Sequence, residues 1–155
     1  MALFPVRLKS GYVSVLIGNG ANPEVFEKIC GASSKSFTYQ KNTTDDVLDP
    51  CDDPEAIPSR VLQVTGRQWD ISLNIIYNRT QAARIRGLMD TSESSNMRFE
   101  FSEPTGTGAT AVDAGYWEGP AQVTNFQVTA GGNAEYATGT LAIASDGEWE
   151  WTDAA

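Results

Sequence analysis

Apolar and polar residues alternate along much of this chain, and an alternation of period two is typical of β-strands. The clearest case is the segment 67–78, where one face carries apolar side chains and the other carries polar ones. The apolar face consists of Trp69, Ile71, Leu73 and Ile75, and the polar face of Asp70, Ser72 and Asn74. The pattern predicts a strand with one face in a hydrophobic core and the other in water.

The same pattern predicts further strands on both sides of this segment. They are expected at residues 12–17, 36–41, 97–102, 115–130, 134–145 and 148–151. Residues 26–31 are expected to form a short strand or a turn closed by Gly31. Segments 115–130 and 134–145 are joined through Gly131, Gly132 and Asn133, and a connection of this kind predicts a β-hairpin.

One segment has helical spacing instead. Within residues 80–89, Ala82, Ile85, Leu88 and Met89 share one face of a helix, and Asn78 or Thr80 can supply the N-cap oxygen. We therefore predict a mainly β protein with one domain spanning residues 1–155. Its fold is an antiparallel β-sandwich or barrel of about seven or eight strands with one flanking α-helix.

A long acidic loop is expected between two of the strands, at residues 42–60. Its acidic residues are Asp45, Asp46, Asp49, Asp52, Asp53 and Glu55, and it contains three prolines. Three interpretations are open: a solvated loop, a calcium site, or a docking arm. The spacing does not match an EF-hand, and prolines favour docking over plain disorder because they reduce the freedom lost on binding. Candidate basic partners for a docking arm are Arg7, Lys9, Arg79, Arg84 and Arg86.

Composition excludes several classes of function. The formal charge of −9 argues against a tightly bound nucleic acid, which needs Lys and Arg to neutralise phosphates. The chain has no histidine, and its two cysteines, Cys30 and Cys51, form no zinc or redox motif. We expect free, buried thiols, with a disulfide as the open alternative. We expect no catalytic residues, no metal and no cofactor.

The tryptophans raise a competing hypothesis. Trp117, Trp149 and Trp151 could form a platform on which sugar rings stack, as in a small carbohydrate-binding β-sandwich. Packing of Trp149 and Trp151 in the core or at a subunit interface is the favoured interpretation. A metal-dependent hydrolase using paired carboxylates is only a formal alternative. No apolar run approaches the ~20 residues that a membrane helix requires.

The order of these segments resembles a known family, the major tail-tube proteins of long non-contractile-tailed bacteriophages and gene transfer agents. The resemblance covers nearly the whole chain and depends on the ordered set rather than on any single motif. The segments that carry it are 26–31, 36–40, 51–54, 66–72, 80–89, 97–101, 115–119, 123–126 and 136–141.

The resemblance implies a structural virion protein. Six copies would form a ring whose sheets join edge to edge around a channel, and stacked rings would form a hollow tube that DNA passes through without being bound. Implied partners are further copies of the chain, a tape-measure protein inside the tube, and tail terminator and distal tail proteins at its ends. The protein would be made and assembled in the bacterial cytoplasm and end in the virion tail, without contact with a membrane.

By position, the resemblance also assigns roles to segments of this chain. The 42–60 loop would contact the next ring, with a weaker assignment for the N-terminal arm 1–10 and the C-terminal tail 148–155. Candidate channel-facing residues are Asp70, Ser72, Asn74 and Glu100, and the acidic charge would repel DNA phosphates. Alternatives within the same class are a tail terminator, a distal tail protein or a tube protein like that of type VI secretion.

Overall fold

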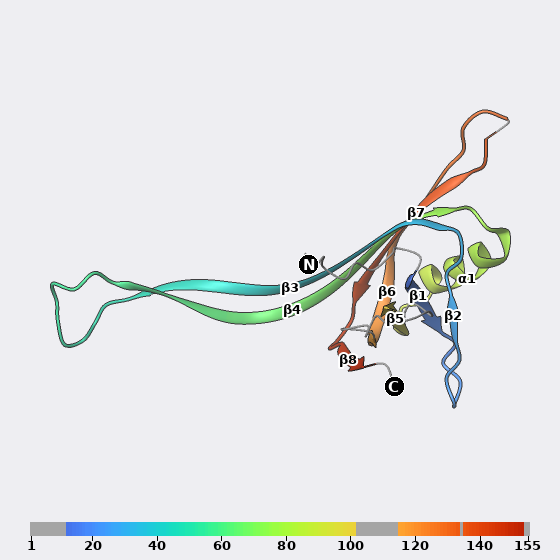
Figure 1. The fold of residues 1–155 in the computed structure, drawn as a ribbon. Coiled ribbons are helices and arrows are strands. Elements are labelled where there is room, and N and C mark those ends of the chain that lie inside the picture. Colours follow the sequence, from blue (N-terminus) through green and yellow to red (C-terminus); the bar gives the residue numbers. More distant parts are fainter. Residues whose placement is uncertain (1–11, 102–114, 134, 154–155) are drawn as a thin grey trace, which may run out of the picture.

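A computed structural model of the protein describes residues 12–101, 115–133 and 135–153 (Figure 1). These residues form eight strands and one helix. In chain order the elements are β1 (Val13–Gly18), β2 (Phe26–Lys28), β3 (Ala32–Leu48), β4 (Ser59–Ile76), α1 (Arg79–Asp90), β5 (Ser95–Phe101), β6 (Gly115–Thr129), β7 (Thr138–Ser145) and β8 (Glu150–Asp153). The expected N-terminal arm, with Arg7 and Lys9, lies outside the described residues.

All eight strands belong to one antiparallel sheet. Seven of them follow the order β2-β1-β5-β6-β7-β4-β3, and the eighth, β8, pairs with β6 outside this order. The long strand β6 pairs with β5 along one edge and with both β7 and β8 along the other. Trp117 shows this arrangement, because it lies opposite Phe99 of β5 and opposite Trp151 of β8. The expected β6–β7 hairpin is confirmed, and the expected C-terminal tail is in part an ordered edge strand, β8.

The sheet curls so that its two ends face each other. Phe37 of β3 stacks on Phe99 of β5 with 4.8 Å between ring centroids, although three strands separate β3 from β5 in the sheet order. The Lys35 ammonium on β3 donates a hydrogen bond of 2.5 Å to the Val13 carbonyl on β1. Partial burial, helped by the nearby charge of Lys28, lowers the pKa of Lys35. The expected mainly β, antiparallel fold is confirmed as one curled sheet.

The core consists of the side chains that the alternation pattern selected. All four predicted apolar residues of β4 are buried, and so are Met97 and Phe99 of β5. The predicted helix is also confirmed, as α1. Its N-cap is Asn78, whose side-chain oxygen accepts a 3.0 Å hydrogen bond from the Thr80 amide. Ala82 and Ile85 are its buried residues. No helix in the described ranges is long and apolar enough to span a membrane.

The prediction of a loop over residues 42–60 is wrong in its extent. Strands β3 and β4 continue into it as a paired ribbon, with Thr43 opposite Val64 and Leu48 opposite Ser59, and only residues 49–58 connect them. We call residues 42–66 the arm; Figure 1 shows it extending far from the body. Sequence periodicity missed these strands because both faces of the ribbon are exposed, and without burial on one face no alternation of apolar and polar residues is required.

Candidate assembly surfaces

The outward faces of four adjacent strands form one polar surface. The pairing register aligns its side chains in three rows across β3, β4, β7 and β6. We call these twelve residues the polar face: Thr38, Asp70, Ala144 and Gln122 in the first row, Ser36, Ser72, Ala142 and Asn125 in the second, and Ser34, Asn74, Thr140 and Gln127 in the third.

The polar face is nearly uncharged. Asp70 is its single ionisable residue, in a chain whose formal charge is −9. Its side chains are short and bond to neighbours: the Asn74 amide donates to the Ser34 hydroxyl at 2.9 Å, and the Gln68 amide donates to the Asp70 carboxylate at 3.0 Å. Such a surface holds water well and carries no cation that would retain a polyanion.

The predicted channel-facing residues do not all lie on the same surface. Asp70, Ser72 and Asn74 lie together on the polar face, as their strand alternation required. Glu100 lies on β5, opposite Ser14 of β1 and Tyr116 of β6, and does not belong to this surface.

The polar face ends at β3, the last strand in the order of the described sheet. Among the described strands, β3 pairs with β4 alone. At the opposite end of the sheet order, β2 contains only three residues. A long exposed edge is a template for pairing with another chain, and soluble proteins usually block it.

The arm exposes apolar side chains on both faces of its ribbon. They are Val47, Leu48, Ile57, Val61, Leu62 and Val64. An isolated two-stranded ribbon is marginally stable in water at best, so this composition favours an arm that another surface covers.

The predicted acidic contact residues all lie on the arm. Asp45 and Asp46 occupy neighbouring positions in β3, and Asp49, Asp52, Asp53 and Glu55 lie in the tip, residues 49–58. Asp45 forms an exposed ion pair of 2.7 Å with Arg60 of the same arm. The four tip residues therefore remain the stronger candidates for contact with another subunit.

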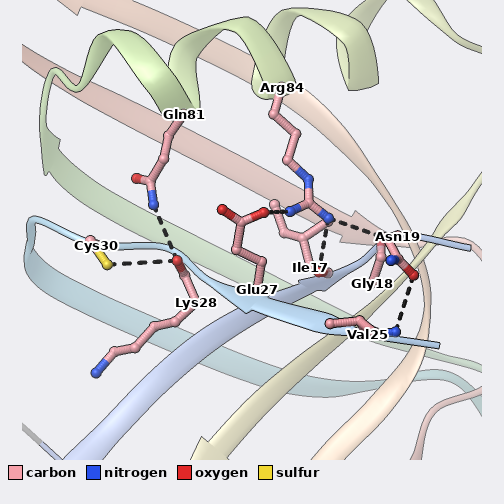
Figure 2. A network of polar contacts seen from close by, with 9 residues as sticks. All are labelled: Ile17, Gly18, Asn19, Val25, Glu27, Lys28, Cys30, Gln81 and Arg84. Carbon is pink, nitrogen blue, oxygen red and sulfur yellow. Dashed lines mark hydrogen bonds and ion pairs between the residues drawn. The ribbon is translucent and has the colours of Figure 1, made fainter. Parts of the chain in front are cut away.

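One predicted basic partner is already occupied within its own subunit. The Arg84 guanidinium donates to the carbonyls of Ile17 and Gly18 at 3.0 and 3.2 Å and forms an ion pair with Glu27 (Figure 2). These contacts join α1 to β1 and β2. Arg79 and Arg86 lie exposed on the helix, so of the three helical arginines only these two are available to a neighbour.

A second contact completes the attachment of the helix. The Gln81 amide donates to the Lys28 carbonyl at 3.1 Å, beside Cys30 at the end of β2 (Figure 2). Nothing in the helical spacing of Arg84 indicated that backbone carbonyls of β1 would lie within its reach.

The tryptophans do not form an open platform. Trp149 is 2% exposed, and its ring nitrogen donates to the Pro120 carbonyl at 2.9 Å. Trp117 and Trp151 are half-buried and meet edge to face, with 5.7 Å between centroids. The favoured interpretation of core packing is confirmed for Trp149, and the sugar-binding hypothesis loses one of its three rings.

The two cysteines are free, as expected, but both are exposed rather than buried. Cys30 precedes β3 and Cys51 follows it, so the 17-residue strand separates them. At about 3.3 Å per residue the strand spans roughly 55 Å, whereas the Cα atoms of a disulfide lie within about 7 Å of each other. A disulfide within one chain is therefore excluded. Within the described ranges, no three potential metal ligands gather.

Comparison with known proteins identifies the fold. No protein-family model and no curated protein matches the sequence. Among solved structures, the chain is similar to one from the virion of a native gene transfer agent particle, at 18% identity over 94% of this chain and 99% of that chain, with a TM-score of 0.67. The chain has the tail-tube fold.

Two further structures extend the comparison. The SPP1 tail tube matches this fold at 10% identity over 96% of this chain and 81% of that chain, with a TM-score of 0.64. The tube-terminating cap of the anti-feeding prophage matches at 12% identity over 99% and 96%, with a TM-score of 0.65. These neighbours are a tail tube and a tube-terminating cap.

Proposed function

We propose that this protein is the repeating subunit of a tail tube, built from stacked hexameric rings around a channel that DNA traverses. The observation that carries the proposal is the polar face: twelve aligned side chains with one charge, on the outside of a sheet with the tail-tube fold. An outward sheet face this poor in charge and in large apolar groups suits the wall of an aqueous channel.

Charge repulsion has a smaller role in this proposal than the sequence indicated. In a hexameric ring, the six copies of Asp70 would place six carboxylates on the channel wall. Most of the negative charge of the chain lies elsewhere, including the arm. The wall would release DNA mainly because it has no Lys or Arg and because its short side chains hold water. The Asp70 ring would add a repulsion that acts over about 8–10 Å at physiological salt.

Ring closure would use the two ends of the sheet, β3 and β2. Edge-to-edge joining of neighbouring subunits would continue the sheet around the ring, and closed cyclic symmetry would leave none of these edges exposed. The arm would bridge to the next ring, where its apolar side chains and acidic tip would find a partner. The N-terminal arm 1–10 and the C-terminal segment 148–155 are secondary candidates for inter-ring contact.

The proposed setting is a virion tail assembled in the bacterial cytoplasm. A tape-measure protein would occupy the channel during assembly, and terminator and distal tail proteins would close the two ends of the tube. DNA would be passing cargo, and no cofactor would be needed.

A tube terminator is the second candidate. The tube-terminating cap of the anti-feeding prophage and the sheath/tube terminator of an extracellular contractile injection system share the fold, with TM-scores of 0.65 and 0.62. A terminator forms one capping ring and stops growth, whereas a tube subunit needs contact surfaces on both ends of the ring. The long apolar arm favours the tube subunit, because a ring that only caps a tube leaves one of its ends without a partner.

Electron microscopy of the purified protein tests the proposal. We expect stacked rings with six-fold symmetry in end views, and tubes that lengthen with protein concentration. Single rings that never stack would indicate a terminator. A protein that stays monomeric at high concentration would overturn both candidates.

A further inference from the structure

The subunit carries projections at the two ends of strand β4: the arm at one end, and the β6–β7 hairpin beside the other. The arm extends the N-terminal part of β4, which ends at Ile76 on the other side of the body. Ile76 pairs with Thr138, the first residue of β7, and residues 130–133 and 135–137 of the β6–β7 hairpin continue past it. Figure 1 shows the arm and this hairpin pointing away from the body in opposite directions.

The hairpin end of the molecule exposes large apolar side chains. Tyr136 is 85% exposed, and Ile76 and Val128 are about half exposed. The Tyr77 amide donates to the Ala137 carbonyl at 2.9 Å, so the chain leaving β4 is bound to the hairpin. Val128 lies in one row with Gly139 and Ile75, on the face of the sheet opposite to the side chain of Ile76. We call Arg79, Val128 and Tyr136 the receiving end.

Arg79 gives the receiving end a positive charge. It follows Tyr77 by two residues, at the start of α1, and is exposed. The described part of the hairpin, residues 125–133 and 135–140, contributes one charged side chain, Glu135. This surface therefore combines apolar groups, a tyrosine and an available guanidinium, residue types that are enriched in protein interfaces.

The arm tip is chemically complementary to this surface. Residues 49–58 contain four acidic residues and no basic residue. They also contain Ile57, which is 88% exposed, and Leu48 beside the tip is 55% exposed. The carboxylates of the tip can form ion pairs with Arg79, and its aliphatic side chains can pack on Tyr136 and its neighbours.

Stacking of rings also requires that one end of a ring contact the opposite end of the next ring. Rings that add repeatedly in one direction form an open filament, and such a filament is held by heterologous contacts between two different surfaces of the same chain. The arm and the receiving end are two such surfaces, at opposite ends of one subunit.

We propose that the receiving end binds the arm tip of a second copy of this chain in the adjacent ring. Arg79 pairs with the carboxylates of the tip, and Tyr136 and Val128 cover its apolar side chains. This inference rests on the proposed function and adds to it the surface on which the arm docks.

Crosslinking in assembled tubes tests the contact directly. In a Cys30→Ser background the natural Cys51 marks the arm tip, and Tyr136→Cys places a second thiol at the receiving end. A short bis-maleimide should then join subunits into dimers and longer ladders. The matched control is Asp90→Cys in the same background, which places an exposed thiol at the other end of α1, about 18 Å along the helix axis. We expect little crosslinking at position 90.

Charge reversal provides an independent readout. Arg79→Glu should raise the protein concentration needed for tube growth about tenfold or more, because it places like charges opposite each other. Arg86→Glu, on the same helix but outside the receiving end, should change it little. Adding Asp52→Lys and Asp53→Lys to Arg79→Glu should restore growth.

The two proposals fail in different ways. Tubes of normal form that crosslink at position 90 as well as at position 136, or not at all at 136, would overturn the docking surface and leave the tube subunit standing. Equal effects of Arg79→Glu and Arg86→Glu without rescue would do the same. A wild-type chain that remains monomeric would overturn both.

Discussion

At the scale of single residues, Trp149 shows how a side chain that resembles a ligand-binding ring serves packing. Its ring lies against Gly119, where an added Cβ would approach the Trp149 Cδ1 atom to 2.2 Å. Its nitrogen satisfies the Pro120 carbonyl. The absence of a side chain at Gly119 therefore provides the space that the indole fills, which ties the residues before β8 to the middle of β6.

This packing predicts the effect of two substitutions. Trp149→Ala should destabilise the subunit by about 3–5 kcal/mol, because it leaves a cavity in the core. Gly119→Ala should cost roughly 1–3 kcal/mol, because the new methyl group collides with the indole. Denaturant unfolding of dilute subunits measures both. A Trp149→Ala variant as stable as wild type would contradict the assigned core position.

Asp146 predicts a dependence of stability on pH. Hydrogen bonds from Ser94 and, to a lesser extent, Gln122 lower the pKa of this carboxyl group. A lowered folded-state pKa means that the ionised form stabilises the fold above the unfolded value of about 4, and that this contribution is lost as the pH falls through the folded pKa. Asp146→Asn should therefore lower the Tm at pH 7.

The same variant has an internal control. The difference in Tm between Asp146→Asn and wild type should shrink as the pH falls below about 4, where the wild-type carboxyl group also becomes neutral. Thermal melts of both proteins between pH 2 and pH 7 check this. A constant difference across the range would show that the charge of Asp146 is not the cause.

At the scale of secondary-structure elements, the arm is the main departure from the expected fold. The alternation of Phe37 and Tyr39 with polar residues predicted a strand at 36–41, and that strand exists. Beyond Lys41 it continues only because its backbone pairs with β4. The body of β3 is defined by burial on one face, and the arm by pairing alone.

The register of the arm predicts how to remove it without unfolding the body. Thr44 pairs with Gln63, so replacing residues 45–62 with Asn-Gly should close a two-residue hairpin at that pair. We expect a folded subunit whose Tm stays within a few degrees of wild type, and no tubes in electron micrographs. Tubes at the normal yield would show that the arm is not the contact between rings.

At the scale of the whole molecule, curling of the sheet separates two environments. The inward faces of β3, β4 and β7 meet β5 across the aromatic and aliphatic core, as the Phe37–Phe99 stack shows. The outward faces of β3, β4, β7 and β6 form the polar face. The same alternation along each strand therefore builds the core and the proposed channel wall together.

The wall assignment predicts what added positive charge does. Tubes of a Ser72→Lys, Asn74→Lys variant should retain short DNA duplexes in a nuclease-protected form, and retention should fall steeply with salt because lysines bind phosphates by releasing counterions. A Thr80→Lys, Ala83→Lys variant carries the same added charge on the outer surface of α1. Its bound DNA should remain sensitive to nuclease. Equal protection in both tubes would contradict the assigned wall.

Much of this protein could be predicted from the sequence, for a physical reason. Trp69, Ile71, Leu73 and Ile75 had to face a core because burying apolar surface drives folding, and burial on one face of a strand leaves a period of two. The helix at Arg79–Asp90 could be recognised from the helical spacing of its apolar residues and from its N-cap residue, Asn78. Strand positions, core faces and the polar character of Asp70, Ser72 and Asn74 were therefore readable in advance.

Only the tertiary structure decided which of these pieces meet. The arm, the occupation of Arg84, the exposure of both cysteines and the separation of Glu100 from the polar face depend on pairing between segments distant in the chain. The type of a residue indicates whether it is buried, because buried positions favour apolar residues. It does not record which exposed backbone edge lies beside which, because every residue except proline offers the same N–H and C=O groups for pairing.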